Sequence, residues 1–121
     1  MSPEELAAFV DSFRSPNVRV HFDTGNAMPF QFPEHWIPVL GKRIKNVHLK
    51  EWSKEGTDFT IEGFRPLLDG STDWPAVMDA FEAAGYGGYV TFEYFRPYPH
   101  YPEALVCQTS DAMNRILGRK A

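Results

Sequence analysis

Hydrophobic residues follow two different periods along this chain. In four segments they recur every three or four residues, the spacing of an amphipathic helix, and in three shorter segments they alternate with polar residues, as in a half-buried strand. The predicted helices span about 3–13, 33–40, 73–84 and 102–117, and the predicted strands span 18–22, 44–49 and 89–93. The order is therefore αβαβαβα. Strands separated by helices pair in parallel through right-handed crossovers.

Helix boundaries are marked by local signals. Ser2, Pro3 and Glu5 supply an N-cap, a first-turn proline and a capping-box glutamate for the first helix. Gly41 and Gly85 follow the second and third helices, where glycine commonly ends a helix. Residues 50–72 are predicted to form a long loop.

Each predicted strand has one apolar and one polar face. In a doubly wound sheet, helices cover both faces and strands are apolar throughout. Here the polar faces end in charged residues at the carboxyl ends of the strands, which is where (βα)8 barrels build their active sites. A three-stranded antiparallel sheet with one solvated face would alternate similarly, but it needs hairpins, and here long, mostly helical connections follow the strands. The pattern favours part of an α/β (βα)8 TIM barrel.

Three side chains at these strand ends are candidate metal ligands. Asp23, His48 and Glu93 each lie at, or one step past, the carboxyl end of a predicted strand, on its polar face. Taken singly, such an aspartate is often a helix cap and such a histidine a hydrogen-bonded core residue. Their shared position on three successive strands predicts convergence on one ion. An oxygen-rich set of ligands favours Mn²⁺, Co²⁺ or Mg²⁺ over Zn²⁺.

Several sequence motifs resemble one known family, the xylose-isomerase-like TIM-barrel superfamily, and within it the sugar phosphate isomerases and epimerases. The resemblance extends over nearly the whole chain and keeps the order of the motifs. These motifs are the segments 21–27, 33–37, 41–44, 47–51, 64–70, 73–77, 85–88 and 92–93.

The resemblance implies a ligand set and a reaction. Such enzymes hold their metal through Glu, Asp, His and Glu on successive late strands, which match Asp23, His48 and Glu93 here, while the first Glu has no counterpart. The three strands would then be the last three of the barrel, and residues 1–121 the C-terminal part of it. Two glutamates transfer the proton beside a carbonyl through a metal-stabilised enediolate. Only Glu93 of that catalytic pair is present, so the isolated chain is expected to be weak or inactive.

Other polar residues are candidates for binding the substrate, a sugar or sugar phosphate. Asn26 could bind a hydroxyl group or simply hold a turn, and Lys50 could bind a hydroxyl or phosphate or pair with Glu51 or Glu93. Arg96 is the candidate for a phosphate or hydroxyl contact. Glu51 stands where relatives often have Asp, which leaves its role open.

Composition narrows the possible partners. The net charge of −4 argues against nucleic acid, because proteins that neutralise phosphates usually carry a basic excess. No apolar run reaches the length of a membrane span. The single cysteine, Cys107, fits a reducing compartment, and we expect a cytoplasmic protein with this residue buried. Open sheet edges predict a homo-oligomer.

Three other functions compete with an isomerase or epimerase, and whether the chain is itself an enzyme stays open. Dehydration of an inosose-type ketone uses a similar site. A fragment that binds metal or sugar without catalysis would keep the ligands and lose the chemistry. An apurinic-site endonuclease of the same superfamily would need more histidines and a basic surface than this sequence offers.

Overall fold

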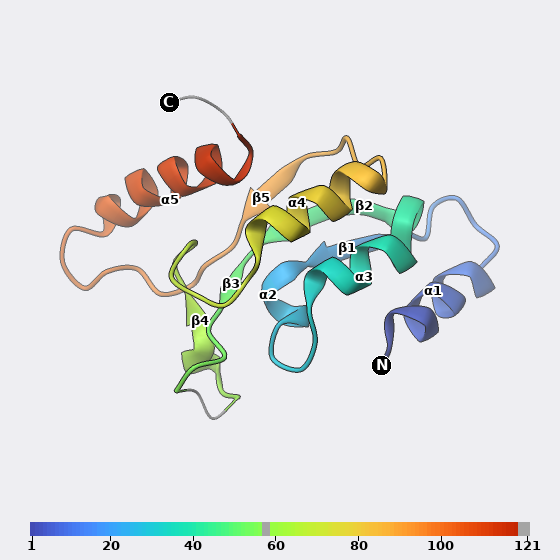
Figure 1. The fold of residues 1–121 in the computed structure, drawn as a ribbon, viewed down its shortest axis with the longest axis horizontal. Helices are drawn as coiled ribbons and strands as arrows, with labels where there is room; N and C mark the ends of the chain where they lie inside the picture. The colour runs from blue at the N-terminus through green and yellow to red at the C-terminus, as the bar shows by residue number, and fades with distance from the viewer. Residues whose placement is uncertain (57–58, 119–121) are drawn as a thin grey trace.

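The computed structural model describes residues 1–56 and 59–118, and its centre is a parallel three-stranded sheet (Figure 1). The strands are β1 (Val20–Asp23), β2 (Ile44–Leu49) and β5 (Val90–Phe92), in the spatial order β1-β2-β5. Asp23 lies opposite His48, and Leu49 lies opposite Phe92, so the carboxyl ends of the three strands come together at one edge. The predicted parallel pairing is confirmed.

Helices form a layer over one face of this sheet. The long helices pack in chain order, with α1 on α3, α3 on α4 and α4 on α5, and α1 and α5 lie at opposite ends of the layer (Figure 1). Helix α1 starts as predicted, because the Ser2 N–H donates to Glu5 and the Glu5 N–H donates to the Ser2 hydroxyl. The helical segments are α1 (Pro3–Ser12), α2 (Thr24–Ala27), α3 (Pro33–Leu40), the 3-10 turn η1 (Gly41–Arg43), α4 (Trp74–Ala83) and α5 (Pro102–Ile116).

The core lies between the sheet and the helices. It is built from the apolar positions of the strands and the inner faces of the helices, chiefly Val20, Phe22, Val47, Leu49, Ile37, Leu40, Val77 and Phe81. On the opposite face of the sheet, His21, Asn46 and Thr91 are exposed. The one-sided pattern seen in the sequence is thus confirmed. It leaves a polar sheet face uncovered by the described residues.

The segment predicted as a long loop contains a second, smaller sheet. Strands β3 (Glu51–Trp52) and β4 (Phe64–Arg65) pair antiparallel, and the 3-10 turn η2 (Ile61–Gly63) precedes β4. Residues 57–58, between the two strands, lie outside the described part of the chain. Two-residue strands are too short to produce a periodic pattern, so sequence alone did not reveal them. Two of the three main strands are also shorter than predicted, since β1 begins at Val20 and β5 spans only Val90–Phe92, whereas β2 has its predicted bounds.

The predicted burial of Cys107 on helix α5 is wrong. Only Leu105 and Ala112 are buried in this helix, and Cys107, expected to be buried, is exposed. Its neighbour Val106 is also 69% exposed. Most residues of α5 are exposed, and its main contact among the described helices and strands is with α4. Neither α5 nor any other helix in the described ranges is long and apolar enough to cross a membrane.

Candidate metal centre

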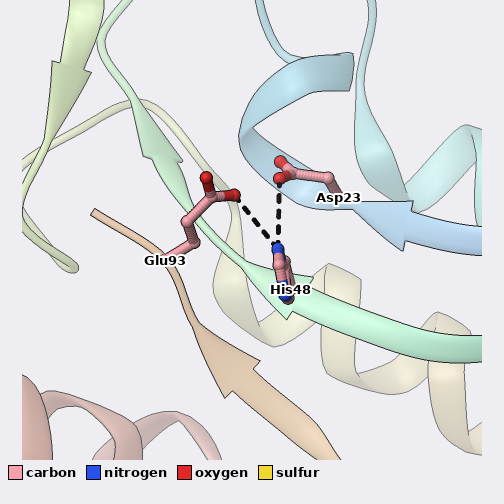
Figure 2. Close-up of side chains that lie close together, drawn as sticks. All are labelled: Asp23, His48 and Glu93. Atoms are coloured by element: carbon pink, nitrogen blue, oxygen red, sulfur yellow. Dashed lines mark hydrogen bonds and ion pairs between the residues drawn. The ribbon is translucent and has the colours of Figure 1, made fainter. Parts of the chain in front are cut away.

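Strand register brings the three candidate ligands to one place. Asp23 is the last residue of β1, and its register partner on β2 is His48. Glu93 follows β5, and its backbone N–H donates to the carbonyl of Leu49 at 3.3 Å. As Figure 2 shows, the three side chains point toward one another from three adjacent parallel strands.

The distances within this cluster suit a shared cation. Nδ1 of His48 lies 3.0 Å from Oε2 of Glu93 and 3.8 Å from Oδ2 of Asp23. One potential ligand atom from each residue lies within 4.8 Å of the other two. The exposed fraction of the side chains rises from 11% for Asp23 to 28% for His48 and 43% for Glu93. Glu93 therefore stands on the open side of the cluster.

Asp23 caps a helix, one of the roles that its sequence position allowed, and still turns one oxygen toward the cluster. Its Oδ1 accepts the backbone N–H of Asn26 at 2.8 Å, which caps the short helix α2. Its other oxygen, Oδ2, faces His48. The cap holds the carboxylate in a fixed orientation and leaves one oxygen free for a cation.

The pKa values of the Asp23 and Glu93 carboxyl groups are shifted in opposite directions. Burial raises the pKa of Asp23, and the hydrogen bond from Asn26 and the charge of Lys50 offset this only in part. Burial also disfavours the ionised form of Glu93, but the hydrogen bond to His48 and the charge of Lys50 outweigh it and lower the pKa of Glu93. Glu93 thus remains a carboxylate near neutral pH, the form that a metal ligand or a base requires.

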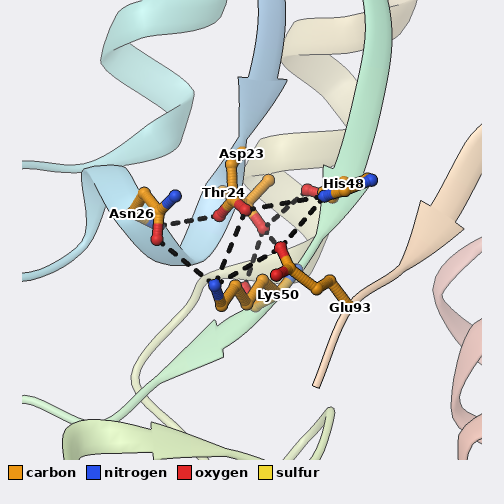
Figure 3. Close-up of polar contacts among 6 residues, drawn as sticks. All are labelled: Asp23, Thr24, Asn26, His48, Lys50 and Glu93. Atoms are coloured by element: carbon orange, nitrogen blue, oxygen red, sulfur yellow. Dashed lines mark hydrogen bonds and ion pairs between the residues drawn. The ribbon is translucent and has the colours of Figure 1, made fainter. Parts of the chain in front are cut away.

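Two of the three predicted substrate-binding residues join the cluster (Figure 3). The ammonium of Lys50 lies 3.3 Å from Oε2 of Glu93 and 3.9 Å from Oδ2 of Asp23. It also donates to Oδ1 of Asn26 at 3.4 Å. Of the partners considered for Lys50 in the sequence, Glu93 is the one present, and Asp23 is an additional one.

Arg96, the third, does not join the cluster. Its guanidinium forms a two-pronged ion pair with the carboxylate of Glu62, and both side chains are exposed. Glu62 lies in the turn η2, directly before β4. Strand β4 belongs to the small second sheet that the sequence did not predict. The pairing could not be foreseen without that sheet.

The structure gives Glu51 a structural role. Its carboxylate is buried and accepts hydrogen bonds from Trp74 Nε1 at 2.7 Å, from the Thr72 hydroxyl at 2.5 Å and from the Thr72 N–H at 3.1 Å. These bonds tie β3 to the start of α4. The hydrogen-bonding capacity of Glu51 is thus used within the fold and away from the cluster.

Sequence reasoning did not foresee the contact of Thr24 with Lys50, nor the contact of two aromatic rings with the Lys50 ammonium. The Thr24 hydroxyl donates to the Lys50 carbonyl at 2.8 Å and accepts the Lys50 N–H at 2.9 Å, which fastens α2 to the end of β2. The ring of Phe64 lies under the Lys50 ammonium at 4.2 Å, and that of Phe95 at 5.4 Å. The one available signal was that Thr24 directly follows Asp23.

The donor set fits a divalent ion. Two carboxylates and one imidazole supply oxygen and nitrogen ligands of the kinds that bind Mn²⁺, Co²⁺ and Zn²⁺. The Lys50 ammonium next to both carboxylates shows independently that this position attracts a cation. Asp23, His48 and Glu93 are the residues that would hold the ion.

Fold and site together define a class: part of a (βα)8 barrel with a candidate metal centre at the carboxyl ends of its strands. The sequence agrees with this assignment, because a family model described as xylose isomerase-like TIM barrel matches residues 1–116. The chain belongs to that family. A comparison with curated proteins finds no match.

Solved structures share the fold. A xylose isomerase domain protein from Planctomyces limnophilus is 18% identical with a TM-score of 0.76, and the match covers 98% of this chain and 43% of that one. The IOLI protein with a binding zinc atom is 20% identical with a TM-score of 0.81, and the match covers 95% of this chain and 43% of that one. A D-allulose 3-epimerase from Methylomonas sp. is 21% identical with a TM-score of 0.70, and the match covers 95% of this chain and 43% of that one. The chain thus spans less than half the length of these structures, and its three strands form a partial barrel.

Proposed function

We propose that this chain carries part of the active site of a divalent-metal-dependent sugar isomerase or epimerase. The convergence of Asp23, His48 and Glu93 at one edge of a parallel sheet carries this proposal. Two similar structures support the reaction type, since one is a D-allulose 3-epimerase and the other an L-ribulose 3-epimerase. The zinc in the IOLI protein supports a metal at such a site. We propose Mn²⁺, Co²⁺ or Mg²⁺ for this chain, with Zn²⁺ as the competitor.

The residues of the cluster have different proposed roles. Asp23, His48 and Glu93 hold the ion, which when bound would polarise a substrate carbonyl as a Lewis acid. Glu93 is the most exposed of the three and is ionised, so it is the residue placed to accept a proton from the carbon beside the carbonyl. Asn26 and Lys50 present an amide and an ammonium beside it for sugar hydroxyl groups. Arg96 would contact a phosphate only after leaving Glu62.

Inversion at a carbon atom needs a second acid–base group on the opposite face. Two glutamates near these strands in the sequence, Glu51 and Glu62, are already occupied, because Glu51 accepts from Trp74 and Thr72 and Glu62 pairs with Arg96. Losing one positioned acid–base group typically costs about 10²–10⁴ in rate. We therefore propose that the 121-residue chain by itself turns over ketoses slowly or not at all. Metal and sugar binding without turnover is the alternative that this shortage favours.

Solvent exchange tests the proposal. The Mn²⁺-loaded chain is incubated in D₂O with a panel of ketoses and ketose phosphates. The metal is then removed with chelator, and deuterium beside the carbonyl is measured by NMR. Any exchange should depend on the metal and disappear in Glu93→Gln, while Glu55→Gln, an exposed glutamate elsewhere, should behave like the wild type. Exchange that persists in Glu93→Gln would contradict the role given to Glu93.

We also propose that the chain self-associates. Both β1 and β5 are edge strands in the described sheet, and the polar sheet face is uncovered. Phe9 and Phe13 of the first helix region form an edge-to-face pair and are 57% and 51% exposed. Unpaired strand edges and exposed aromatic groups both favour contact with another chain.

The state of Cys107 bears on the cellular compartment of the protein. Cys107 is a free, exposed thiol, a state that a reducing compartment preserves. We therefore propose that the protein resides in the cytoplasm.

A further inference from the structure

Lys50 places a nearly buried positive charge against two of the residues proposed to hold the metal. Its side chain is only 6% exposed, although lysine side chains usually reach into water. The ammonium lies 3.3 Å from Oε2 of Glu93 and 3.9 Å from Oδ2 of Asp23. These are the same two carboxylate oxygens that face Nδ1 of His48.

The chain holds Lys50 in this place from both ends. Its backbone N–H and carbonyl are both bonded to the Thr24 hydroxyl, at 2.9 and 2.8 Å. The stem of the side chain passes so close to Gly25 that a Cβ there would lie 2.7 Å from Lys50 Cγ. At the other end, Asn26 accepts from the ammonium, and the ring of Phe64 lies 4.2 Å from it. An exposed lysine in casual contact would show none of these restraints.

An ammonium and a divalent ion cannot both occupy this position favourably. Lys50 Nζ approaches the same two carboxylate oxygens that a divalent ion held by Asp23 and Glu93 would need, so the two cations would compete for them. Two cations that approach the same oxygens repel each other, and the repulsion is strong where little water screens it. Conversely, two carboxylates with neither cation would repel each other.

We propose that Lys50 is a built-in counter-ion that holds Asp23 and Glu93 together in the metal-free protein and gives way when the divalent ion binds. The displaced ammonium stays beside the Phe64 and Phe95 rings and Asn26, which already contact it. The exchange lets the ligand cluster stay assembled without metal, at the cost of weaker metal binding. This inference rests on the proposed metal site and adds a competitor for that site.

Replacing Lys50 with methionine tests the exchange. Lys50→Met keeps the length of the stem and removes the charge, so we expect calorimetry to show tighter Mn²⁺ binding, by roughly 5- to 150-fold, the usual range of coupling between two sites. Thermal unfolding should show a lower midpoint than the wild type without metal and a larger rise when Mn²⁺ is added. Lys54→Met is the matched control, because Lys54 also lies over an aromatic ring, at 3.7 Å from Phe32, but pairs with the Gln31 carbonyl. It should leave Mn²⁺ affinity unchanged.

A second measurement uses the wild-type protein and does not depend on the variant folding. Lysine acylation by a water-soluble reagent, read out by mass spectrometry, should be slow at Lys50 without metal and at least severalfold faster with saturating Mn²⁺, while Lys54 stays constant. Equal or weaker Mn²⁺ binding by Lys50→Met, or metal-independent acylation of Lys50 in a protein that does bind Mn²⁺, would overturn the counter-ion role alone. If neither wild type nor Lys50→Met binds Mn²⁺, the metal site falls as well, and with it this proposal.

Discussion

Nδ1 of His48 lies 3.0 Å from Oε2 of Glu93, although the two residues are 45 positions apart in the sequence. The contact exists because β2 and β5 are parallel neighbours whose carboxyl ends coincide. It places an imidazole against a carboxylate at the edge of the sheet, with Asp23 on the other side. The predictions below depend on this arrangement and on the contacts that support it.

Removing the imidazole should abolish metal binding without unfolding the protein. His48 is partly exposed at the strand end, so His48→Ala removes a proposed ligand and little of the core. We expect calorimetry to show Mn²⁺ binding by the wild type and none by the variant, with similar thermal midpoints in the absence of metal. His100→Ala changes an exposed histidine outside the cluster and should bind like the wild type. Equal affinity in His48→Ala would exclude His48 as a ligand.

Glu51→Ala should destabilise the fold. The variant leaves the buried Trp74 indole N–H and the Thr72 N–H and hydroxyl without their acceptor. An unsatisfied buried donor costs about 1–3 kcal/mol, so the buried Trp74 indole N–H alone should lower the free energy of unfolding by that amount, and the part-buried Thr72 donors add to the loss. Urea denaturation measures it. Glu55→Ala, at an exposed position, should change stability by no more than about 0.5 kcal/mol.

Gly25 tests the packing around Lys50. In Gly25→Ala, the new Cβ would lie 2.7 Å from Lys50 Cγ, so the side chain or α2 must shift. Overpacking of this kind typically costs about 1–3 kcal/mol, which urea denaturation would detect. Gly87→Ala is the control, because no atom in the described part of the chain lies within 4 Å of its added Cβ. Equal stability of the two variants would mean that Lys50 is loosely held.

Self-association should be visible in solution. Light scattering during gel filtration should report a dimer or larger species at micromolar concentration. Replacing both Phe9 and Phe13 by serine should shift the equilibrium toward smaller species, because the pair is exposed and each ring offers apolar surface to a neighbour. A wild-type chain that stays monomeric at every concentration would contradict the proposed assembly.

The order of helices and strands was predictable because it depends on short-range rules. The capping box at Ser2 and Glu5, the glycine after α3 and the alternation along β2 each act within a few residues. The same alternation placed Asp23, His48 and Glu93 on one face of their strands. Convergence then followed from parallel pairing, which the helical connections imply.

Contacts between distant segments were not predictable in the same way. The pairing of β3 with β4 depends on two residues from each strand and on the turn between them, too little to show as a period. Arg96 pairs with Glu62 only because that small sheet brings Glu62 near the segment after β5. Cys107 is exposed because the main contact of α5 among the described helices and strands is with α4, whereas its residue type predicted burial.

The sequence by itself therefore determined the succession of the four long helices and three main strands, the polar face of the sheet and the three candidate ligands, since all of these follow from side-chain periodicity. Only the tertiary structure decided that Lys50 turns its charge onto Asp23 and Glu93, that Glu51 is fully used by Trp74 and Thr72, and that Arg96 is drawn away. Those outcomes depend on which partners the folded chain brings within hydrogen-bond distance. Periodicity shows which face of its helix or strand a side chain lies on. The distances between side chains of different elements are set only when the chain has packed.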